Sequence, residues 1–205
     1  MYIPKEFQEN DLERVKELID ANPFGMLCNS SQNGVEITHL PFVWNEGGKE
    51  LLSHLAILNT QSQIENGSKV KVVFAGPHAY ISPSLYNSAR SVPTWNYLAA
   101  HISGTIEYLD SPADVRMVME AMIRCFEPSY MHVWENLPEK YLSGMFTQLR
   151  AFRIPIEKVE AVAKLSQNKS DEERHRIAQH LLQSEPGQVR DTGFWMQAYL
   201  DGLNT

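Results

Sequence analysis

The sequence has little cysteine and no excess of positive charge. Cys28 and Cys125 are the two cysteines among 205 residues, and they lie far apart with no CxxC spacing. This usage favours reduced, buried thiols over a disulfide framework or a structural zinc site. Eighteen basic residues against twenty-five acidic ones give a net charge of −7, which argues against a broad basic face for nucleic acid. An anionic ligand must therefore find a local pocket.

Long apolar runs and familiar catalytic signatures are also missing. The longest stretch without Lys, Arg, Asp or Glu, residues 91–106, contains polar residues and is too short to span a bilayer. The N-terminus, Met1-Tyr2-Ile3-Pro4, lacks a secretory signal pattern, which predicts a cytoplasmic location. No GxGxxG, GxxxxGK[ST], GxSxG or HExxH motif occurs. The classical dinucleotide, P-loop, serine hydrolase and zincin classes are therefore excluded.

The first part of the chain has strand and turn patterns that are typical of an antiparallel sheet. A helix is predicted after Asn10 or Asp11 and ends before Pro23. Turns at Gln32-Asn33-Gly34 and Gly47-Gly48 join strand patterns into two hairpins, which predict a meander. A later strand should break at Gly76-Pro77. The predicted strands are 24–29, 35–44, 50–56, 69–75 and 96–109.

The second part of the chain adds helices to this sheet. Ser111-Pro112 predicts a helix start, and inserted helices should occupy about 111–149. Residues 150–156 are expected to form an edge strand because Pro155 has no donor. A capping box at Ser170 opens a C-terminal helical segment of about 170–200, whose aromatic tail should dock on the domain or on a second subunit. The fold class is α+β, a small antiparallel barrel with flanking helices in one domain, 1–205.

The middle of the chain concentrates neutral polar and aromatic residues. Residues 76–84, Tyr86 and residues 92–97 mix donors, acceptors and flat rings with almost no charge. This composition suits a pocket for a planar heteroaromatic ligand. The alternative is a turn-rich connection whose hydroxyls cap its own backbone.

Histidines and one polar segment offer further candidates. His39, His54, His78 and His101 lie in or beside predicted strands, so they could face a common cavity as hydrogen-bond donors or as structural core residues. Their spacing disfavours metal ligation. The segment 164–169, before the capping box, could hold a phosphate or could be a solvated loop.

Several of these motifs, read together, resemble the PaiB-like family. They are Met1-Tyr2-Ile3-Pro4, Thr38-His39-Leu40-Pro41, His54-Leu55-Ala56 with Asn59, and the segments 76–84, 92–97 and 164–168. The resemblance implies a split β-barrel that binds FMN and acts as a negative transcriptional regulator or a flavin-dependent sensor. It also implies a homodimer that holds FMN in a groove at the dimer interface. The site residues implied are His39, His54, Asn59, Thr60, His78, Tyr80, Ser82, Ser84, Thr94, Trp95, Asn96, Lys164, Ser166, Gln167 and Asn168.

The chain departs from the family pattern at positions that bear on FMN affinity. Ile57 and Leu58 follow Ala56, where the family usually has a basic residue, so FMN binding is expected to be weak. The loop before Val92 lacks the usual lysine, and Arg90 is its possible substitute. A flavin- or haem-dependent oxidoreductase using the same groove is the alternative function. No catalytic acid or base is identified, and direct DNA contact is not favoured because the helix after Ser170 begins with acidic residues.

Overall fold

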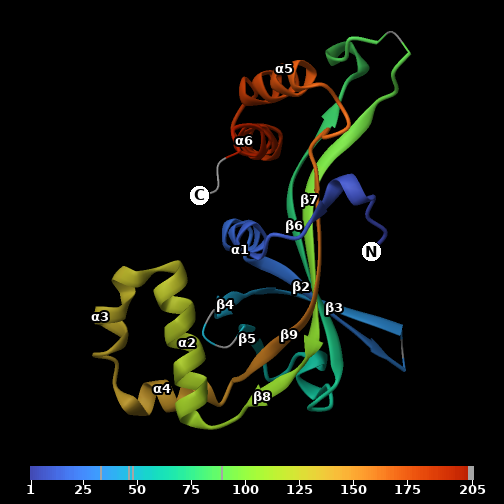
Figure 1. The fold of residues 1–205 in the computed structure, drawn as a ribbon. Helices are drawn as coiled ribbons and strands as arrows, with labels where there is room; N and C mark the ends of the chain where they lie inside the picture. Colours follow the sequence, from blue (N-terminus) through green and yellow to red (C-terminus); the bar gives the residue numbers. More distant parts are fainter. Residues whose placement is uncertain (33, 46, 48, 89, 203–205) are drawn as a thin grey trace. The chain divides into compact units, whose positions relative to one another are not determined.

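The fold is that of an antiparallel sheet with helices, as described by a computed structural model (Figure 1). The structure describes residues 1–32, 34–45, 47, 49–88 and 90–202. Within them lie nine strands and six α-helices, and the predicted α+β class is confirmed. The strands are β1 (Gln8–Glu9), β2 (Phe24–Ser31), β3 (Gly34–Pro41), β4 (Val43–Asn45), β5 (Glu50–Ala56), β6 (Lys69–Ile81), β7 (Thr94–Thr105), β8 (Glu107–Leu109) and β9 (Leu149–Lys164). The helices are α1 (Leu12–Ala21), α2 (Pro112–Phe126), α3 (Met131–Trp134), α4 (Glu139–Phe146), α5 (Asp171–Leu182) and α6 (Gln188–Leu200).

The chain divides into two compact units. Unit 1 comprises Met1–Leu18, Ala75–Ala100 and Glu160–Thr205, and unit 2 comprises Ile19–Phe74 and His101–Val159. The strand order is β3-β2-β6-β7-β9-β5-β4, with β1 and β8 each pairing with β9. Strands β6, β7 and β9 contribute residues to both units.

Three aromatic rings form the centre of unit 2. Phe42 lies edge-on to Phe74 at 5.6 Å and to Phe152 at 6.3 Å, and all three are buried. Helix α2 packs on β5 and β9 through Val115, Val118 and other apolar side chains that form a second cluster. Helices α3 and α4 lie beside α2 (Figure 1).

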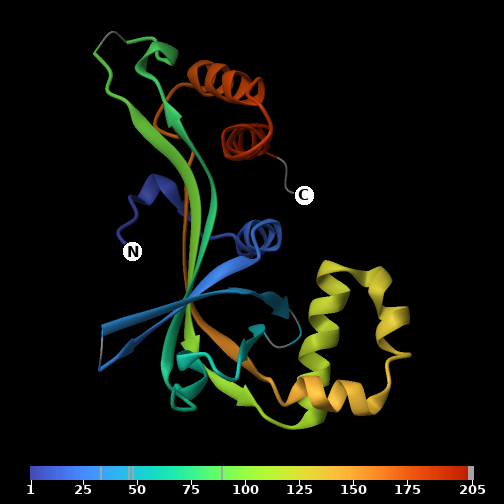
Figure 2. The same cartoon turned by 180° about the vertical axis from the view of Figure 1, so that it is seen from behind.

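In unit 1 the C-terminal helices pack on each other and on the N-terminal segment. Helices α5 and α6 lie side by side (Figure 2). A Cβ at Gly193 of α6 would lie 3.0 Å from the Leu181 Cβ of α5, so glycine permits this close approach. The hydroxyl of Tyr199 donates to the carboxylate of Glu9, and the Arg14 guanidinium lies 4.5 Å from the Tyr199 ring centroid. The aromatic tail therefore docks on its own chain, which is the first of the two predicted alternatives.

The helix starts predicted from local sequence are confirmed. The Asp11 carboxylate accepts from the Glu13 amide before α1, and the Ser111 hydroxyl accepts from the Asp114 amide at the start of α2. At α5, Ser170 and Glu173 form the predicted capping box. Each cap depends only on residues within one helical turn, which is why the sequence reveals it.

The predicted strand 35–44 is interrupted, and the meander is wrong. Strand β3 ends at Pro41, which has no N–H for the ladder, and β4 begins at Val43. Between them Phe42 turns into the aromatic centre of unit 2. As a result β3 and β4 lie at the two ends of the strand order. The turn predictions that include Asn33 and Gly48 fall outside the described residues.

The break predicted at Gly76-Pro77 is also wrong, because β6 continues to Ile81. A Cβ at Gly76 would lie 2.6 Å from the Leu18 Cδ1, so glycine here allows close packing and does not mark a turn. Among the described residues β2 pairs with β6 from Lys71 to Val73 only. Pro77 has no backbone N–H, but it lies outside the segment of β6 that pairs with β2. No hydrogen bond to β2 is therefore lost.

Residues 150–156 are not an edge strand. They belong to β9, which lies between β7 and β5 in the strand order. Pro155 pairs with Glu50, the first residue of β5, so its missing donor falls where that ladder ends. The predicted strand 96–109 is divided into β7 and β8 at Ile106, whose backbone bonds instead to Gly67 and Ser68.

The two cysteines are free thiols, but they are not buried as predicted. Cys28 is partly exposed and Cys125 is exposed. Among the described helices, none combines the length and apolarity that a membrane crossing requires.

Candidate functional site

A cavity of about 350 Å³ in unit 1 gathers several of the residues that the sequence singles out. It opens where the loop before β7, the end of β9 and the loop before α5 meet. This volume is at the lower end of the range for small-molecule pockets. The predicted site residues that line it are Thr94, Asn96, Lys164, Ser166 and Asn168.

A buried amide and a hydroxyl fix one wall of the cavity. Asn96 donates to the Ser166 hydroxyl at 3.0 Å, and that hydroxyl donates back to the Asn96 carbonyl oxygen at 3.1 Å. Both side chains are almost completely buried. Ser166 has a φ of 63°, a left-handed conformation that is unfavourable for a residue with a Cβ. The reciprocal bonds with Asn96 hold the loop in this conformation.

Lys164 brings a positive charge to the same cavity. Its ammonium donates to the Thr94 hydroxyl at 2.6 Å and lies 5.8 Å from the Phe7 ring centroid. The side chain is half-buried. A neighbouring candidate, Gln167, is used differently, because its amide bonds to the backbone of Leu165 and Ala163. Gln167 therefore shapes the loop and does not line the cavity.

The other predicted residues of β6 and β7 form an exposed aromatic face, defined by His78, Tyr80 and Trp95. The Trp95 ring lies 5.9 Å from the His78 ring and 6.0 Å from the Tyr80 ring, centroid to centroid. Tyr80 and Trp95 are 51% and 53% exposed. Because side chains alternate along a strand, Trp95 points away from the side that carries Thr94 and Asn96.

Ser82 and Ser84 serve the turn that follows β6. The Ser82 hydroxyl accepts from the Ser84 amide at 3.2 Å and lies 2.9 Å from the Ser84 hydroxyl. It caps a short 3-10 helix at Pro83–Leu85. The Ser82 hydroxyl thus makes the backbone-capping contact that the alternative interpretation expects, whereas the Ser84 hydroxyl contacts that of Ser82.

In unit 2, Asn59 and Thr60 begin a second 3-10 helix, Thr60–Gln63. The Asn59 amide donates to the Thr38 hydroxyl at 3.2 Å, and the Thr60 hydroxyl donates to Glu36 at 3.3 Å. The sequence analysis missed the adjacent Gln61, which is 1% exposed and whose Oε1 has no hydrogen-bond partner among the residues that the structure describes. Its Nε2 ties β2 and β3 to this turn by donating to the Leu27 carbonyl of β2 at 3.1 Å and to the Glu36 carbonyl of β3 at 3.3 Å.

The two predicted histidines of unit 2 have different surroundings. His39 is exposed on β3 and stacks at 6.0 Å on Phe24. The His54 side chain is half-buried, and its Nδ1 lies 3.4 Å from the Met122 sulfur of α2. No group of three or more His, Cys, Asp or Glu within the described part of the chain could hold a metal ion. Ile57 and Leu58, which occupy the place of the family's basic residue, are exposed, Leu58 by 92%.

The environment of His54 predicts acid sensitivity. Burial lowers the pKa of the His54 imidazole from its usual 6.5. The unfolded chain then binds a proton more tightly than the folded chain, so the free energy of unfolding falls as the pH drops below about 6.5. We expect the free energy of unfolding of His54→Gln, measured by urea unfolding, to fall less between pH 7 and pH 5 than that of wild type. His180→Gln, which removes an exposed imidazole of α5, is the control. Parallel curves for wild type and His54→Gln would contradict the assignment.

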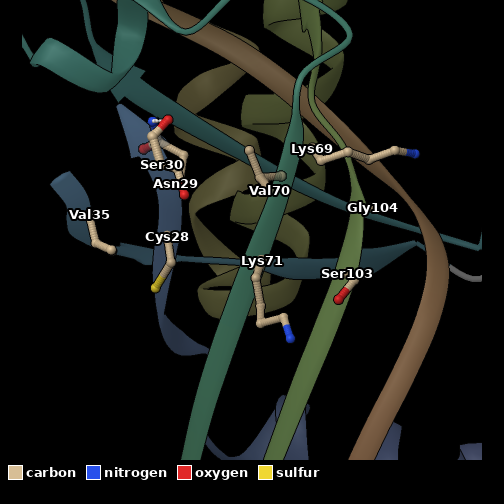
Figure 3. A pocket seen from close by; sticks show the side chains of 9 residues that line it. All are labelled: Cys28, Asn29, Ser30, Val35, Lys69, Val70, Lys71, Ser103 and Gly104. Carbon is tan, nitrogen blue, oxygen red and sulfur yellow. Dashed lines mark hydrogen bonds between the residues drawn. The ribbon is translucent and has the colours of Figure 1, made fainter. Parts of the chain in front are cut away.

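A second hollow, of about 330 Å³, lies in unit 2 on β2, β6 and β7 (Figure 3). Burial raises the pKa of the Cys28 thiol on its wall, and the charge of Lys71 opposes this rise. The Lys69 ammonium extends away from Cys28 and binds the Glu157 carboxylate at 2.7 Å. None of the predicted site residues lines this hollow within the described residues, so it is the weaker candidate.

Comparison with known proteins identifies the family. A family model described as "putative FMN-binding domain" matches residues 1–158. The chain is 32% identical to protease synthase and sporulation protein PAI 2 of Bacillus subtilis (strain 168) over 190 residues, 90% of this chain and 91% of that protein. It therefore belongs to the PaiB-like family of FMN-binding-domain proteins. An uncharacterized protein of Saccharomyces cerevisiae is 33% identical over 166 residues, 68% of this chain and 98% of its own.

Solved structures share the fold at low sequence identity. The flavocytochrome Anf3 from Azotobacter vinelandii aligns with a TM-score of 0.64 and 13% identity, over 79% of this chain and 72% of that one. An FAD and haem binding protein from Mycobacterium smegmatis aligns with a TM-score of 0.62 and 17% identity, over 77% and 73%. The split-barrel fold predicted from the sequence is confirmed by these similarities.

Proposed function

We propose that this chain binds FMN and that the flavin ring lies against the exposed aromatic face of unit 1. The observation that carries the proposal is the cluster of His78, Tyr80 and Trp95, in which the Trp95 ring lies within about 6 Å of each of the other two rings and all three side chains are exposed. Exposed rings gain free energy when a flat heteroaromatic surface covers them. In a member of an FMN-binding-domain family, that surface is the isoalloxazine.

The residues near this face suit the rest of the cofactor. The unit 1 cavity supplies neutral donors and a lysine, which match the hydroxyls and the phosphate of the FMN side chain. FMN supplies one- or two-electron transfer when it is bound. Contacts from His39, His54, Asn59 and Thr60 remain predictions, as do those from Ser82, Ser84 and Gln167.

We further propose that the protein works as a homodimer in the cytoplasm and regulates transcription. A second copy of the chain would cover aromatic surface that one copy leaves open. Free cysteines are typical of a reducing compartment. The first turn of α5 carries Asp171, Glu172 and Glu173, so regulation through a protein partner is favoured over direct DNA contact. We likewise propose that residues 1–205 form a single domain.

An FMN titration of the purified protein tests the proposed function. We expect flavin fluorescence to change on binding and Trp95→Leu to weaken FMN affinity by about 2- to 10-fold, because an aromatic contact contributes about 0.5–1.5 kcal/mol. Tyr141→Leu is the matched control, since this ring is 54% exposed on α4 in unit 2.

Two results would contradict the proposal. One is an unchanged spectrum of wild type at high micromolar FMN. The other is equal FMN affinity of Trp95→Leu and Tyr141→Leu. A haem titration in parallel tests the haem-dependent oxidoreductase alternative. Bound haem would give a Soret band, which a flavin complex does not.

A further inference from the structure

Helix α5 holds the connection between β6 and β7 through the side chain of Arg176. The Arg176 Nε donates to the Leu85 carbonyl at 2.9 Å, and its Nη2 donates to the Asn87 side-chain oxygen at 2.7 Å. Its Nη1 lies 3.5 Å from a Glu172 carboxylate oxygen of the same helix. Because the guanidinium is planar and rigid, these contacts fix Leu85 and Asn87 relative to α5.

Glu173, three residues earlier on α5, holds the same connection. Its Oε1 accepts from the Asn87 backbone amide at 2.9 Å, and its Oε2 accepts from the Ser170 hydroxyl at 2.9 Å in the capping box. The Asn87 amide above all, and then Ser170 and Lys169, lower the pKa of the Glu173 carboxyl. Glu173 is therefore ionised at neutral pH, and the helix cap orients the oxygen that Asn87 contacts.

Tyr86 lies in the chain between the two residues that α5 holds. Its side chain is 9% exposed and lines the unit 1 cavity, and the Lys169 ammonium lies 4.0 Å from its ring centroid. Burial, and then Glu173 and Tyr80, raise the pKa of the Tyr86 hydroxyl, which therefore stays protonated. Among the residues that the structure describes, this hydroxyl has no hydrogen-bond partner, so its proton can be donated to a ligand.

The helix that makes these contacts lies outside the part of the chain that the family model matches. That model matches residues 1–158, whereas α5 begins at Asp171. The contacts of Arg176 and Glu173 therefore come from a segment that follows the FMN-binding domain, and they act on a connection inside that domain.

We propose that Arg176 and Glu173 are positioning residues of the unit 1 site, which hold Tyr86 where its hydroxyl donates to an oxygen atom of a bound ligand. Neither residue is among the described residues that line the cavity, so the effect of both reaches the ligand through Tyr86. The proposal rests on the proposed function in one respect, which is that FMN serves as the ligand in the binding test.

Fluorescence titration with FMN tests whether Arg176 acts through Tyr86. Arg176→Gln and Tyr86→Phe should each weaken FMN affinity by about 2- to 10-fold, because each loses one hydrogen bond to the ligand. The double variant should bind FMN no more weakly than Tyr86→Phe alone, since both changes remove the same contact. Losses of affinity that add in the double variant would overturn the proposal.

Further variants separate positioning from the loss of a charge. Glu173→Gln keeps an oxygen for the Asn87 amide and for the helix cap, so it should bind FMN like wild type, whereas Glu173→Ala should bind it as weakly as Arg176→Gln. Arg124→Gln is the control for the loss of an arginine, because it breaks an ion pair of 3.1 Å with Glu120 on α2 in unit 2, and it should bind like wild type. Equally weak binding by Glu173→Gln and Glu173→Ala would contradict the positioning role.

Limited trypsin digestion tests the contacts of α5 in the absence of any ligand. Arg90 is exposed and follows the held segment, and cleavage after it gives fragments 1–90 and 91–205, which mass spectrometry identifies. Arg176→Gln should speed this cleavage by about 10-fold relative to wild type and to Arg124→Gln, because a charge-assisted hydrogen bond is lost. Glu173→Ala replaces Arg176→Gln if the latter does not fold.

The two measurements distinguish this proposal from the proposed function. Equal cleavage rates in all these proteins overturn the positioning role, and they leave FMN binding by wild type intact. Faster cleavage of Arg176→Gln, in a protein whose wild type has no affinity for FMN, supports the contacts of α5 and refutes the proposed function.

Discussion

Gly104→Ala is expected to lower the free energy of unfolding by about 3 kcal/mol or more, since overpacking against backbone cannot relax by a rotamer change. Gly104 lies on β7, where a Cβ would come 2.2 Å from the Pro155 carbonyl oxygen and 2.6 Å from the Ile154 Cγ2. Relief would require β9 to move away from β7 in unit 2. Urea unfolding followed by circular dichroism measures the effect.

A glycine in a different setting gives the control for this prediction. A Cβ at Gly144 in α4 meets nothing within 4 Å, so Gly144→Ala should stabilise the protein by about 0.5–1 kcal/mol through the helix propensity of alanine. If both variants change stability in the same direction, the close approach at Gly104 is refuted.

Phe42→Ala is expected to destabilise the protein by about 3–5 kcal/mol, the range for removing a buried aromatic ring. The ring is 1% exposed and makes edge-on contacts with Phe74 and Phe152. Truncation therefore leaves a cavity between two further rings and removes both contacts. The measurement is the free energy of unfolding in urea.

Two further variants distinguish the effect of losing buried volume on stability from the effect of losing an aromatic ring. Phe42→Leu keeps much of the volume and should cost about 1–2 kcal/mol. Phe194→Ala removes a ring that is 55% exposed on α6 and should change stability by about 0.5 kcal/mol or less. Equal losses for Phe42→Ala and Phe194→Ala would show that Phe42 is not a packing centre.

The parts of the fold that could be predicted are those set by neighbours in sequence. The caps at Asp11, Ser111 and Ser170 each depend on a residue two or three positions away. In contrast, the neighbours in sequence did not show that β6 continues through Gly76-Pro77 or that Pro155 lies in an inner strand. Whether a missing donor matters depends on which strand lies alongside, and the partner comes from a distant part of the chain.

The same distinction applies to the site. Thr94, Asn96, Lys164, Ser166 and Asn168 were identified through motifs, and the structure brings them to one cavity. Phe7 was not identified as a cavity residue, because no local pattern shows that the first turn of the chain packs beside Lys164. The aromatic face follows from the alternation of two strands that were only partly predicted.

The walls of the unit 1 cavity come from segments as distant as Phe7, Thr94 and Lys169, so the cavity exists only when that unit is folded. Any molecule that occupies it binds the native chain and not the unfolded one, and mass action then shifts the balance away from the form that proteases degrade. We therefore expect a ligand of this cavity to lengthen the cellular lifetime of the protein.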